Sequence, residues 1–292
     1  MPTKQKTRLL AVLALLFTAT LWGIIWYPLR LLDNAGLGGL WSSLVVYAAA
    51  LSTGLFALWR NWHSIVQHPR LSIAMLLFGG WTNVAFILAV LDGNVVRVLL
   101  LFYLSPIWAM ILGWLFLHER PTPVMILAFV IAMAGAFTML WLPDANMTSA
   151  WQTSDWLAIS SGLAFALTNT TVRKAQYMAI WPKAVLTWLG VVSVAIVIIL
   201  VQGQPVPHVS MMTILFAILL GLIGMVSMTL AVQYGVTHMR VQQSSVILLF
   251  ELVAGAVSAQ LLTNEQILLR EWLGGSLIIL AALLVARQVT KE

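Results

Sequence analysis

The chain has 292 residues, of which 61% are apolar and only 8% are charged, and its mean hydropathy is +0.97. This composition excludes a soluble protein with a charged surface and indicates an integral membrane protein. The 15 Lys and Arg residues outnumber the 9 Asp and Glu residues, which gives a net charge of +6. Most of the basic residues lie between apolar runs, which indicates membrane topology rather than a nucleic-acid-binding surface.

Ten apolar segments predict membrane-spanning helices, because a helix needs about 20 apolar residues to cross the hydrocarbon core. They cover residues 9–31, 40–59, 71–91, 95–117, 123–142, 155–177, 184–201, 210–234, 241–262 and 271–288. The first segment carries Trp22, Trp26 and Tyr27 where a cleaved signal peptide would have small residues, so it is predicted to be a span. The loops are short, so the function is expected to lie within an all-α membrane bundle.

The basic residues predict which side of the membrane each loop faces. With a cytoplasmic N-terminus, 12 of the 15 basic residues fall on the cytoplasmic side: Lys4, Lys6, Arg8, Arg60, Arg70, Arg120, Arg173, Lys174, Lys183, Arg240, Arg287 and Lys291. Loops rich in Lys and Arg stay in the cytoplasm, so both termini are predicted to be cytoplasmic. We expect a multi-pass protein of the plasma membrane, which in a bacterium is the inner membrane.

The ten segments divide into two halves of five, residues 1–146 and 147–292. A unit of five spans ends on the opposite side of the bilayer from its start, so a second copy is inverted relative to the first, as in many transporters. The sequences LFLHE, ending at Glu119, and LLTNE, ending at Glu265, lie 146 residues apart and close the fourth span of each half. The predicted fold is therefore ten transmembrane helices arranged as two inverted five-helix repeats.

Glu251 is the one acidic residue near the middle of a predicted span. A carboxylate there is costly unless it is neutralised, paired or hydrated, so it is expected to face the interior of the bundle. Ser244, Leu248, Gly255 and Ser258 follow the same spacings of three and four residues, which predicts one helical face along a cavity. Glu251 would bind a substrate ammonium group or take up a proton that drives exchange; a structural hydrogen bond is the alternative.

Aromatic and amide side chains near the middle of spans are the other candidates. Most of the 14 tryptophans are expected at span ends, where the indole favours the headgroups, but Trp22, Trp81 and Trp108 lie in mid-span. The predicted substrate-binding residues are Trp22, Trp81, Asn83, Phe86, Tyr103, Trp108, Ser244, Leu248 and Glu251. Such a wall would receive an apolar or aromatic group by stacking and cation–π contacts. Interhelical packing is the alternative for each, and weaker candidates of the same kind are Thr168, Asn169 and Gln233.

Proline and glycine inside the spans predict places where helices bend or pack closely. The expected hinge residues are Pro28, Pro106, Gly224 and Gly255. Arg97 and Asp92, five residues apart, are predicted to form a solvated pair at the outer mouth, or to steer an anionic group there.

Three sets of residues carry a family resemblance. They are the pair Trp22-Gly23 in the first span, LSPIW and LHERP in the fourth (Leu104–Trp108 and Leu117–Pro121), and a weaker ending formed by Glu265, Gly274 and Gly275. In this order and spacing the chain resembles the drug/metabolite transporter superfamily, specifically its ten-span EamA-type exporters. The second half differs from the usual pattern because Leu252 stands where Pro106 aligns. The resemblance implies export of small metabolites, often amino acids or related compounds, through a central cavity between the repeats.

Other classes of function are not favoured. No G-x-S-x-G, H-E-x-x-H or P-loop sequence occurs, and Glu251 has no second mid-span acid with which to form a dyad, so an intramembrane enzyme is a remote alternative. The five histidines lack ligand spacing, and no metal or cofactor is expected.

An aromatic, weakly charged cavity favours neutral hydrophobic or aromatic amino acids as exported substrates. Multidrug or quaternary-cation efflux is the alternative, because the same Trp and Glu side chains would bind a lipophilic cation. The expected partners are a small-molecule substrate and the lipid bilayer, without nucleic acid. A ten-span bundle encloses its own cavity, so a monomer suffices.

Overall fold

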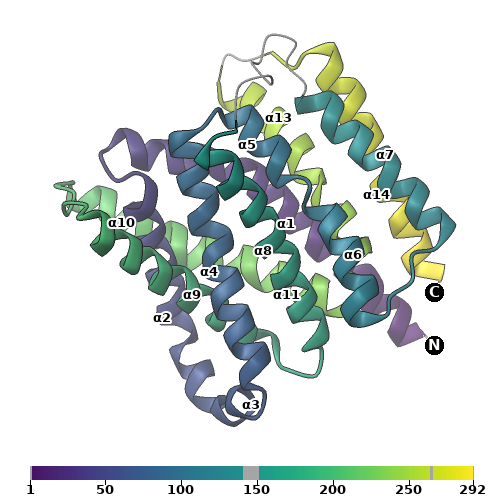
Figure 1. The fold of residues 1–292 in the computed structure, drawn as a ribbon, viewed down its shortest axis with the longest axis horizontal. Helices are drawn as coiled ribbons and strands as arrows, with labels where there is room; N and C mark the ends of the chain where they lie inside the picture. The colour runs from purple at the N-terminus through teal and green to yellow at the C-terminus, as the bar shows by residue number, and fades with distance from the viewer. Residues whose placement is uncertain (1, 141–150, 264–265, 292) are drawn as a thin grey trace.

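In a computed structural model, which describes residues 2–140, 151–263 and 266–291, every regular element is a helix (Figure 1). The helices before residue 141 are α1 (Pro2–Asn34), α2 (Gly39–Arg60), α3 (Trp62–Gln67), α4 (Pro69–Asp92), α5 (Val95–Phe102), α6 (Ser105–Leu117) and α7 (Pro123–Leu140). Those after residue 150 are α8 (Thr153–Lys174), α9 (Ile180–Gln202), α10 (Met211–Leu219), the π-helix η1 (Leu220–Met225), α11 (Val226–His238), α12 (Val241–Leu248), α13 (Phe250–Leu262) and α14 (Leu269–Lys291).

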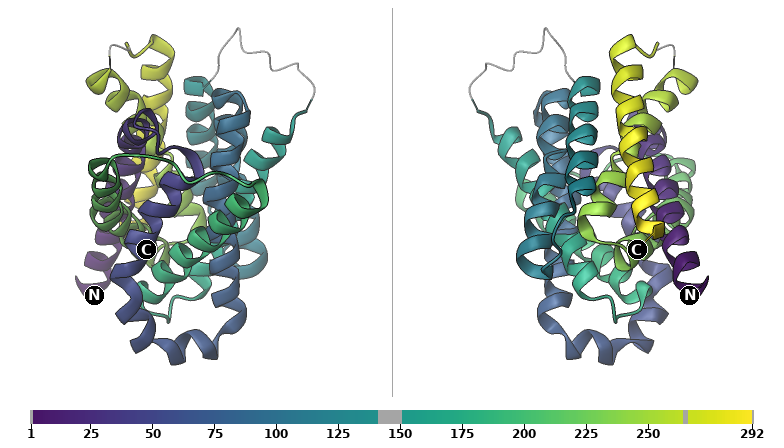
Figure 2. Two further views of the ribbon diagram at one scale, coloured as in Figure 1. Left: turned by 90° about the vertical axis from the view of Figure 1, so that its left-hand side faces the viewer. Right: turned by 90° about the vertical axis from the view of Figure 1, so that its right-hand side faces the viewer.

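Nine helical segments among the described residues are long and apolar enough to cross a membrane. They correspond to nine of the ten expected spans, within a few residues at each end. The expected span 155–177 forms α8, which has the length of a span but is less apolar, so it does not fall within this group. The short helix α3, at the turn between α2 and α4, was not expected from the sequence; Figure 2 shows it at the lower edge of the molecule.

Three expected spans are not single α-helices. The span 95–117 consists of α5 and α6, and Pro106, in the first turn of α6, accounts for the interruption because proline has no main-chain N–H to donate. The span 241–262 is interrupted at Leu249, between α12 and α13, without any proline. The span 210–234 contains η1, one turn of wider helix that includes Gly224.

The two interrupted spans have matching parts. The helices α5 and α12 each have 8 residues, and α6 and α13 each have 13. The interruptions at Tyr103 and Leu249 lie 146 residues apart, because 249 minus 103 is 146. This is the offset that separates Glu119 from Glu265, although Glu265 itself lies outside the described residues.

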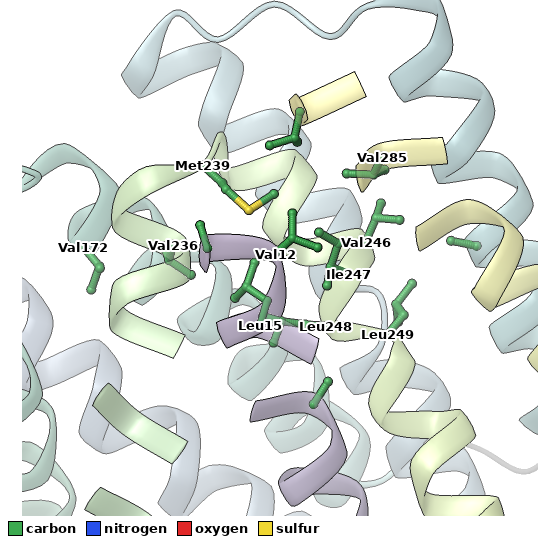
Figure 3. Packing of buried hydrophobic residues seen from close by; sticks show 14 of the residues in the cluster. Val12, Leu15, Val172, Val236, Met239, Val246, Ile247, Leu248, Leu249 and Val285 are labelled. Atoms are coloured by element: carbon green, nitrogen blue, oxygen red, sulfur yellow. The ribbon is translucent and has the colours of Figure 1, made fainter. Parts of the chain in front are cut away.

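The first helix on each side of residue 146 packs against helices of the other side. The helix α1 runs through the middle of the molecule against α11 and α13, whereas α8 packs against α4, α5 and α6. Figure 3 shows Val12 and Leu15 of α1 among Val236 of α11 and Ile247 of α12, and these four side chains belong to the largest buried apolar cluster. The helices α7 and α14 pack side by side and contribute side chains, such as Met125 and Val285, to the same cluster.

The helices α4 and α9 approach closely at two glycines. A Cβ atom on Gly190 would lie 2.0 Å from the main-chain oxygen of Leu76, and a Cβ on Gly80 would lie 2.5 Å from the main-chain oxygen of Gly190. Small residues at such crossings let main chains pack directly, which is the main source of helix association in a bilayer. Since the contacting atoms belong to the main chain, they cannot rotate away from an added methyl group.

We expect Gly190→Ala to destabilise the protein by about 1–3 kcal/mol, because it overpacks the α4–α9 crossing. Gly113→Ala is the matched control, since a Cβ there would meet no atom closer than Glu119 Oε2 at 3.8 Å. Thermal unfolding of the purified protein in detergent, followed by size-exclusion chromatography, compares the two variants with the parent. Equal stability of the two alanine variants would contradict the prediction.

Candidate functional site

A cavity of about 170 Å³ lies at the centre of the bundle, lined by helices from both sides of residue 146. The lining residues before residue 141 are Trp22, Tyr47, Gly79, Thr82, Asn83, Phe86, Phe102, Tyr103, Ser105 and Pro106. Those after residue 150 are Phe165, Thr168, Asn169, Thr187, Val191, Thr229, Val232, Gln233, Ser245, Leu248, Leu249 and Glu251. Both interrupted spans border the cavity at their interruptions.

A hydrogen bond joins the two interruptions. Tyr103 follows the last residue of α5, and its hydroxyl donates to Glu251 Oε1 at 2.5 Å. Glu251 is the second residue of α13, and a carboxylate in the first turn of a helix is stabilised by the unpaired main-chain N–H groups there. The two interrupted spans are therefore in contact at the cavity wall, through one side chain from each.

Aromatic rings form one side of the cavity. The Phe102 ring centroid lies 4.9 Å from that of Phe86, 5.4 Å from that of Tyr103 and 5.8 Å from that of Phe165. The rings are tilted or edge-to-face, the arrangements that aromatic pairs prefer. Three helices, α4, α5 and α8, thus contribute to a continuous aromatic surface that suits an apolar or aromatic group.

Amide side chains form a polar part of the lining. Asn83 Nδ2 donates to the Tyr47 hydroxyl at 3.1 Å, and Gln233 Nε2 donates to Thr187 Oγ1 at 3.4 Å. The other amide atoms, Asn83 Oδ1 and Gln233 Oε1, are buried without a hydrogen-bond partner. These two carbonyl oxygens are therefore left as acceptors for a water or for a polar group of a solute.

Six of the nine predicted substrate-binding residues line the cavity: Trp22, Asn83, Phe86, Tyr103, Leu248 and Glu251. Trp81 does not, because it lies off the face of α4 that carries Asn83 and Phe86, and its indole N–H donates to Ser160 Oγ at 3.2 Å. Trp108 packs instead among apolar residues of α6 and α8. Whether the six bind substrate remains a prediction.

Ser244 also lies off the cavity. It is 1% exposed, and its hydroxyl donates to Val241 O within α12 at 2.9 Å. The expected continuous stripe from Ser244 to Ser258 does not form, because the interruption at Leu249 ends the helical period on which it depended. Ser258 instead accepts a hydrogen bond from the Trp26 indole at 2.9 Å.

The expected hinge residues lie in different settings. Pro106 lines the cavity at the start of α6, whereas Pro28 lies inside α1 and Gly224 lies in η1. Gly255 lies at the crossing of α1 and α13, where a Cβ on Gly23 would come within 2.6 Å of its main-chain nitrogen. Gly23 therefore lets α1 pack directly on the first turns of α13, beside Glu251.

Several lining residues were not predicted. Tyr47, Phe102 and Phe165 lie near the middle of expected spans, and Thr187 and Thr229 lie nearer the ends of theirs. The weaker candidates Thr168, Asn169 and Gln233 line the cavity with them. A polar or aromatic residue in mid-span is a sequence signal, but sequence alone does not show which of them face one another.

The EamA-like transporter family model matches the chain twice, over residues 9–141 and 152–287. The chain belongs to the EamA-like transporter family. Its family is one of membrane transporters, and the apolar helices agree with a multi-pass membrane protein.

Similarity to individual proteins agrees with this assignment. The chain is 23% identical over 177 residues to the uncharacterized transporter PA0485 of Pseudomonas aeruginosa, an alignment that covers 58% of this chain and 56% of the relative. A crystal structure with a TM-score of 0.74 and 12% identity, which covers 94% of each chain, has the same fold.

In this EamA-like transporter two ion pairs hold α8 to the interrupted helix pair α5–α6. At one end Arg97 Nη2 lies 2.7 Å from Asp155 Oδ2, and at the other Arg173 Nε lies 3.0 Å from Glu119 Oε1. The expected solvated pair between Arg97 and Asp92 was wrong. Asp155 is 2% exposed, so the pair that Arg97 forms is buried between helices.

Glu119 also connects the two halves on the side where α1 begins and α14 ends, here called the termini side. Its Oε2 accepts from the main-chain N–H of Val241 at 2.9 Å, so it caps the start of α12. The positive φ of His118, 57°, turns the chain after α6 and brings Glu119 back over the helix end. The LHERP sequence thus has a structural role at this side.

Lys183 is a second feature of the termini side that the sequence did not reveal. It is fully buried, and its ammonium donates to Thr237 Oγ1 at 2.5 Å and to Ala175 O at 3.4 Å. Arg173 Nη1 donates to Thr237 O at 2.6 Å. The ends of α8 and α11 and the start of α9 are thus joined by cations that bind helix C-terminal carbonyls, a favourable arrangement.

We expect Glu119→Gln to loosen the contact among α6, α8 and α12, because the neutral amide weakens both the ion pair and the helix cap. The chain has no cysteine, so Ser244→Cys provides a single reporter at a buried position one turn from the cavity. Labelling by a water-soluble maleimide should be several times faster when Glu119→Gln is present.

The matched control is Asp155→Asn, which removes the ion pair at the opposite end of α8. It should leave labelling of the Ser244→Cys reporter unchanged. Equal labelling rates in the Glu119→Gln and parent backgrounds would show that Glu119 does not close the termini side.

Proposed function

We propose that this protein exports small metabolites that carry an apolar or aromatic body and an amino group, a class that includes hydrophobic and aromatic amino acids. The observation that carries the proposal is the central cavity, which combines an aromatic wall with the mid-span carboxylate of Glu251. Stacking would hold the body of the solute, and the carboxylate would attract the amino group.

The proposed architecture is ten spans in two inverted five-helix repeats, residues 1–146 and 147–292, with α8 as the sixth span. Support comes from the 146-residue offset between the interrupted spans and from two separate matches of the family model. Five spans per repeat place the copies in opposite orientations. Interrupted helices beside a midplane cavity are typical of transporters built in this way.

Transport would proceed by alternating access. The helix segments on either side of Tyr103 and Leu249 would swing at the interruptions, and the termini side would open by separation of Glu119 from Val241. By the distribution of basic residues the termini side would face the cytoplasm, in the inner membrane of a bacterium. One chain contains the whole cavity, so a monomer suffices.

The size of the cavity favours a small solute. At about 170 Å³ it lies below the roughly 300–1,000 Å³ of pockets that take drug-sized ligands. An efflux pump for quaternary cations is the second candidate, because Glu251 and the aromatic rings together suit a lipophilic cation.

Uptake of a labelled amino-acid panel and a quaternary ammonium dye into proteoliposomes tests the proposal. We expect an aromatic or branched amino acid or its amine to be transported, with a loss of about tenfold or more in Phe86→Ala, because stacking area is removed. The control is Phe137→Ala, at an exposed site on α7 away from the cavity. Transport of the dye alone would favour the second candidate.

The role of Glu251 is tested by counterflow without a pH gradient. If Glu251 only binds the amino group, Glu251→Gln should weaken solute affinity while exchange persists at saturating solute. If it is the obligatory proton carrier, the same variant should still exchange but should lose accumulation driven by a pH gradient. A variant that retains both affinity and accumulation would exclude both roles.

A further inference from the structure

The described residues of the cavity lining carry charge of one sign only. Among the described residues that line the cavity, Glu251 is the only one with a formal charge, and none is Lys, Arg or His. Lys183 lies one turn from Thr187 on α9, but its ammonium binds Thr237 and Ala175 instead of lining the cavity. No side chain in the lining therefore compensates a negative group on a bound solute.

Five of the eight hydroxyl groups in the described lining are already committed as donors. Thr82, Thr168, Thr187 and Ser245 each donate to a main-chain oxygen three or four residues earlier, at 2.7, 2.9, 3.0 and 2.9 Å. Tyr103 donates to Glu251. Because a hydroxyl carries a single proton, these five groups can offer only lone pairs to a solute.

The hydrogen bond that Thr187 donates within its own helix determines the orientation of the Gln233 amide. The proton of Thr187 is used by Lys183 O, so Thr187 Oγ1 can only accept, and the Gln233 group that faces it must be the NH₂. Gln233 Oε1 then points elsewhere. The residue is 4% exposed and lines the cavity, and this oxygen has no hydrogen-bond partner.

Asn83 adds a second unpaired acceptor. Its Nδ2 donates to Tyr47, and its Oδ1 is buried without a partner. Neutral donors remain in the lining, but none carries the positive charge that would offset a carboxylate; they lie on Trp22, Tyr47, Ser105, Asn169 and Thr229. Among the described residues the lining therefore holds one negative charge, two unpaired amide oxygens and no cation.

We infer that the cavity selects solutes whose polar group is a cation with N–H donors, such as a primary ammonium, and that it discriminates against a free carboxylate. This inference rests on the proposed function and narrows its substrate class. An N–H-bearing cation satisfies Glu251, Gln233 Oε1 and Asn83 Oδ1, whereas a quaternary cation leaves the two amide oxygens unpaired. A zwitterionic amino acid places its carboxylate in a lining without a compensating cation.

Binding of four probes with the same aromatic body tests the inference. The probes are phenethylamine, phenylalanine methyl ester, phenylalanine and trimethyl(phenethyl)ammonium, and isothermal titration calorimetry of the full-length protein in nanodiscs measures their affinities. We expect the amine and the ester to bind about tenfold or more tightly than the zwitterion and the quaternary cation, since a hydrogen bond to a charged group is worth at least that factor.

Gln233→Met separates recognition of N–H donors from charge attraction. It keeps the length of the side chain but removes the acceptor, so the preference for phenethylamine over its trimethylated form should fall by about five- to tenfold. The control is Gln202→Met, at the exposed end of α9, which should leave the preference intact.

Different outcomes would contradict the inference about selectivity and the proposed transport function. Phenylalanine binding as tightly as its methyl ester, or the quaternary cation as tightly as the primary amine, would overturn this inference while the proposed function stands. A Gln233→Met variant that folds and keeps the parent's preference would overturn the role of that oxygen. If no probe binds and none is transported, the proposed function fails and the inference fails with it.

Discussion

The hydrogen bond between Tyr103 and Glu251 is the contact on which the arrangement of the cavity depends. It joins two places where a membrane-spanning helix is interrupted, one after α5 and one after α12. At these interruptions the main-chain bonds change to carbonyls three residues earlier, as from Leu104 to Leu101 and from Leu249 to Val246. Such irregular main chain is tolerated inside a bilayer only where protein or a cavity surrounds it. Both interruptions lie at the cavity, and the carboxylate of Glu251 lines it there.

The exchange of α1 and α8 between the two halves explains how this region is enclosed. Each of these helices packs against the opposite half, so the cavity is walled by both halves rather than lying within one. The least apolar helix, α8, takes part in an ion pair near each of its ends, through Asp155 and Arg173. A helix that is surrounded by protein does not need the apolar surface that lipid requires, which accounts for its composition.

Much of the site was predictable from residues that are out of place in a bilayer. Glu251, Asn83 and Trp22 were identified because polar or indole groups in mid-span have no favourable contact with lipid, and all three line the cavity. The same reasoning misplaced Trp81 and Trp108, since an indole in mid-span can pack against a neighbouring helix instead: Trp81 donates to Ser160 of α8, and Trp108 packs among apolar side chains. The predicted stripe from Ser244 to Ser258 was wrong for another reason. The helix is interrupted at Leu249, and no proline there indicates the interruption in the sequence.

The sequence by itself determined the membrane environment, the positions of nearly all spans and the identity of the mid-span carboxylate, because these follow from local hydropathy and the cost of burying charge. Only the tertiary structure decided which polar groups meet, since that depends on helix rotation and crossing. It paired Arg97 with Asp155 rather than Asp92, and it placed Glu119 over the start of α12. It also left Gln233 Oε1 without a partner, because the hydroxyl proton of Thr187 is used within its own helix.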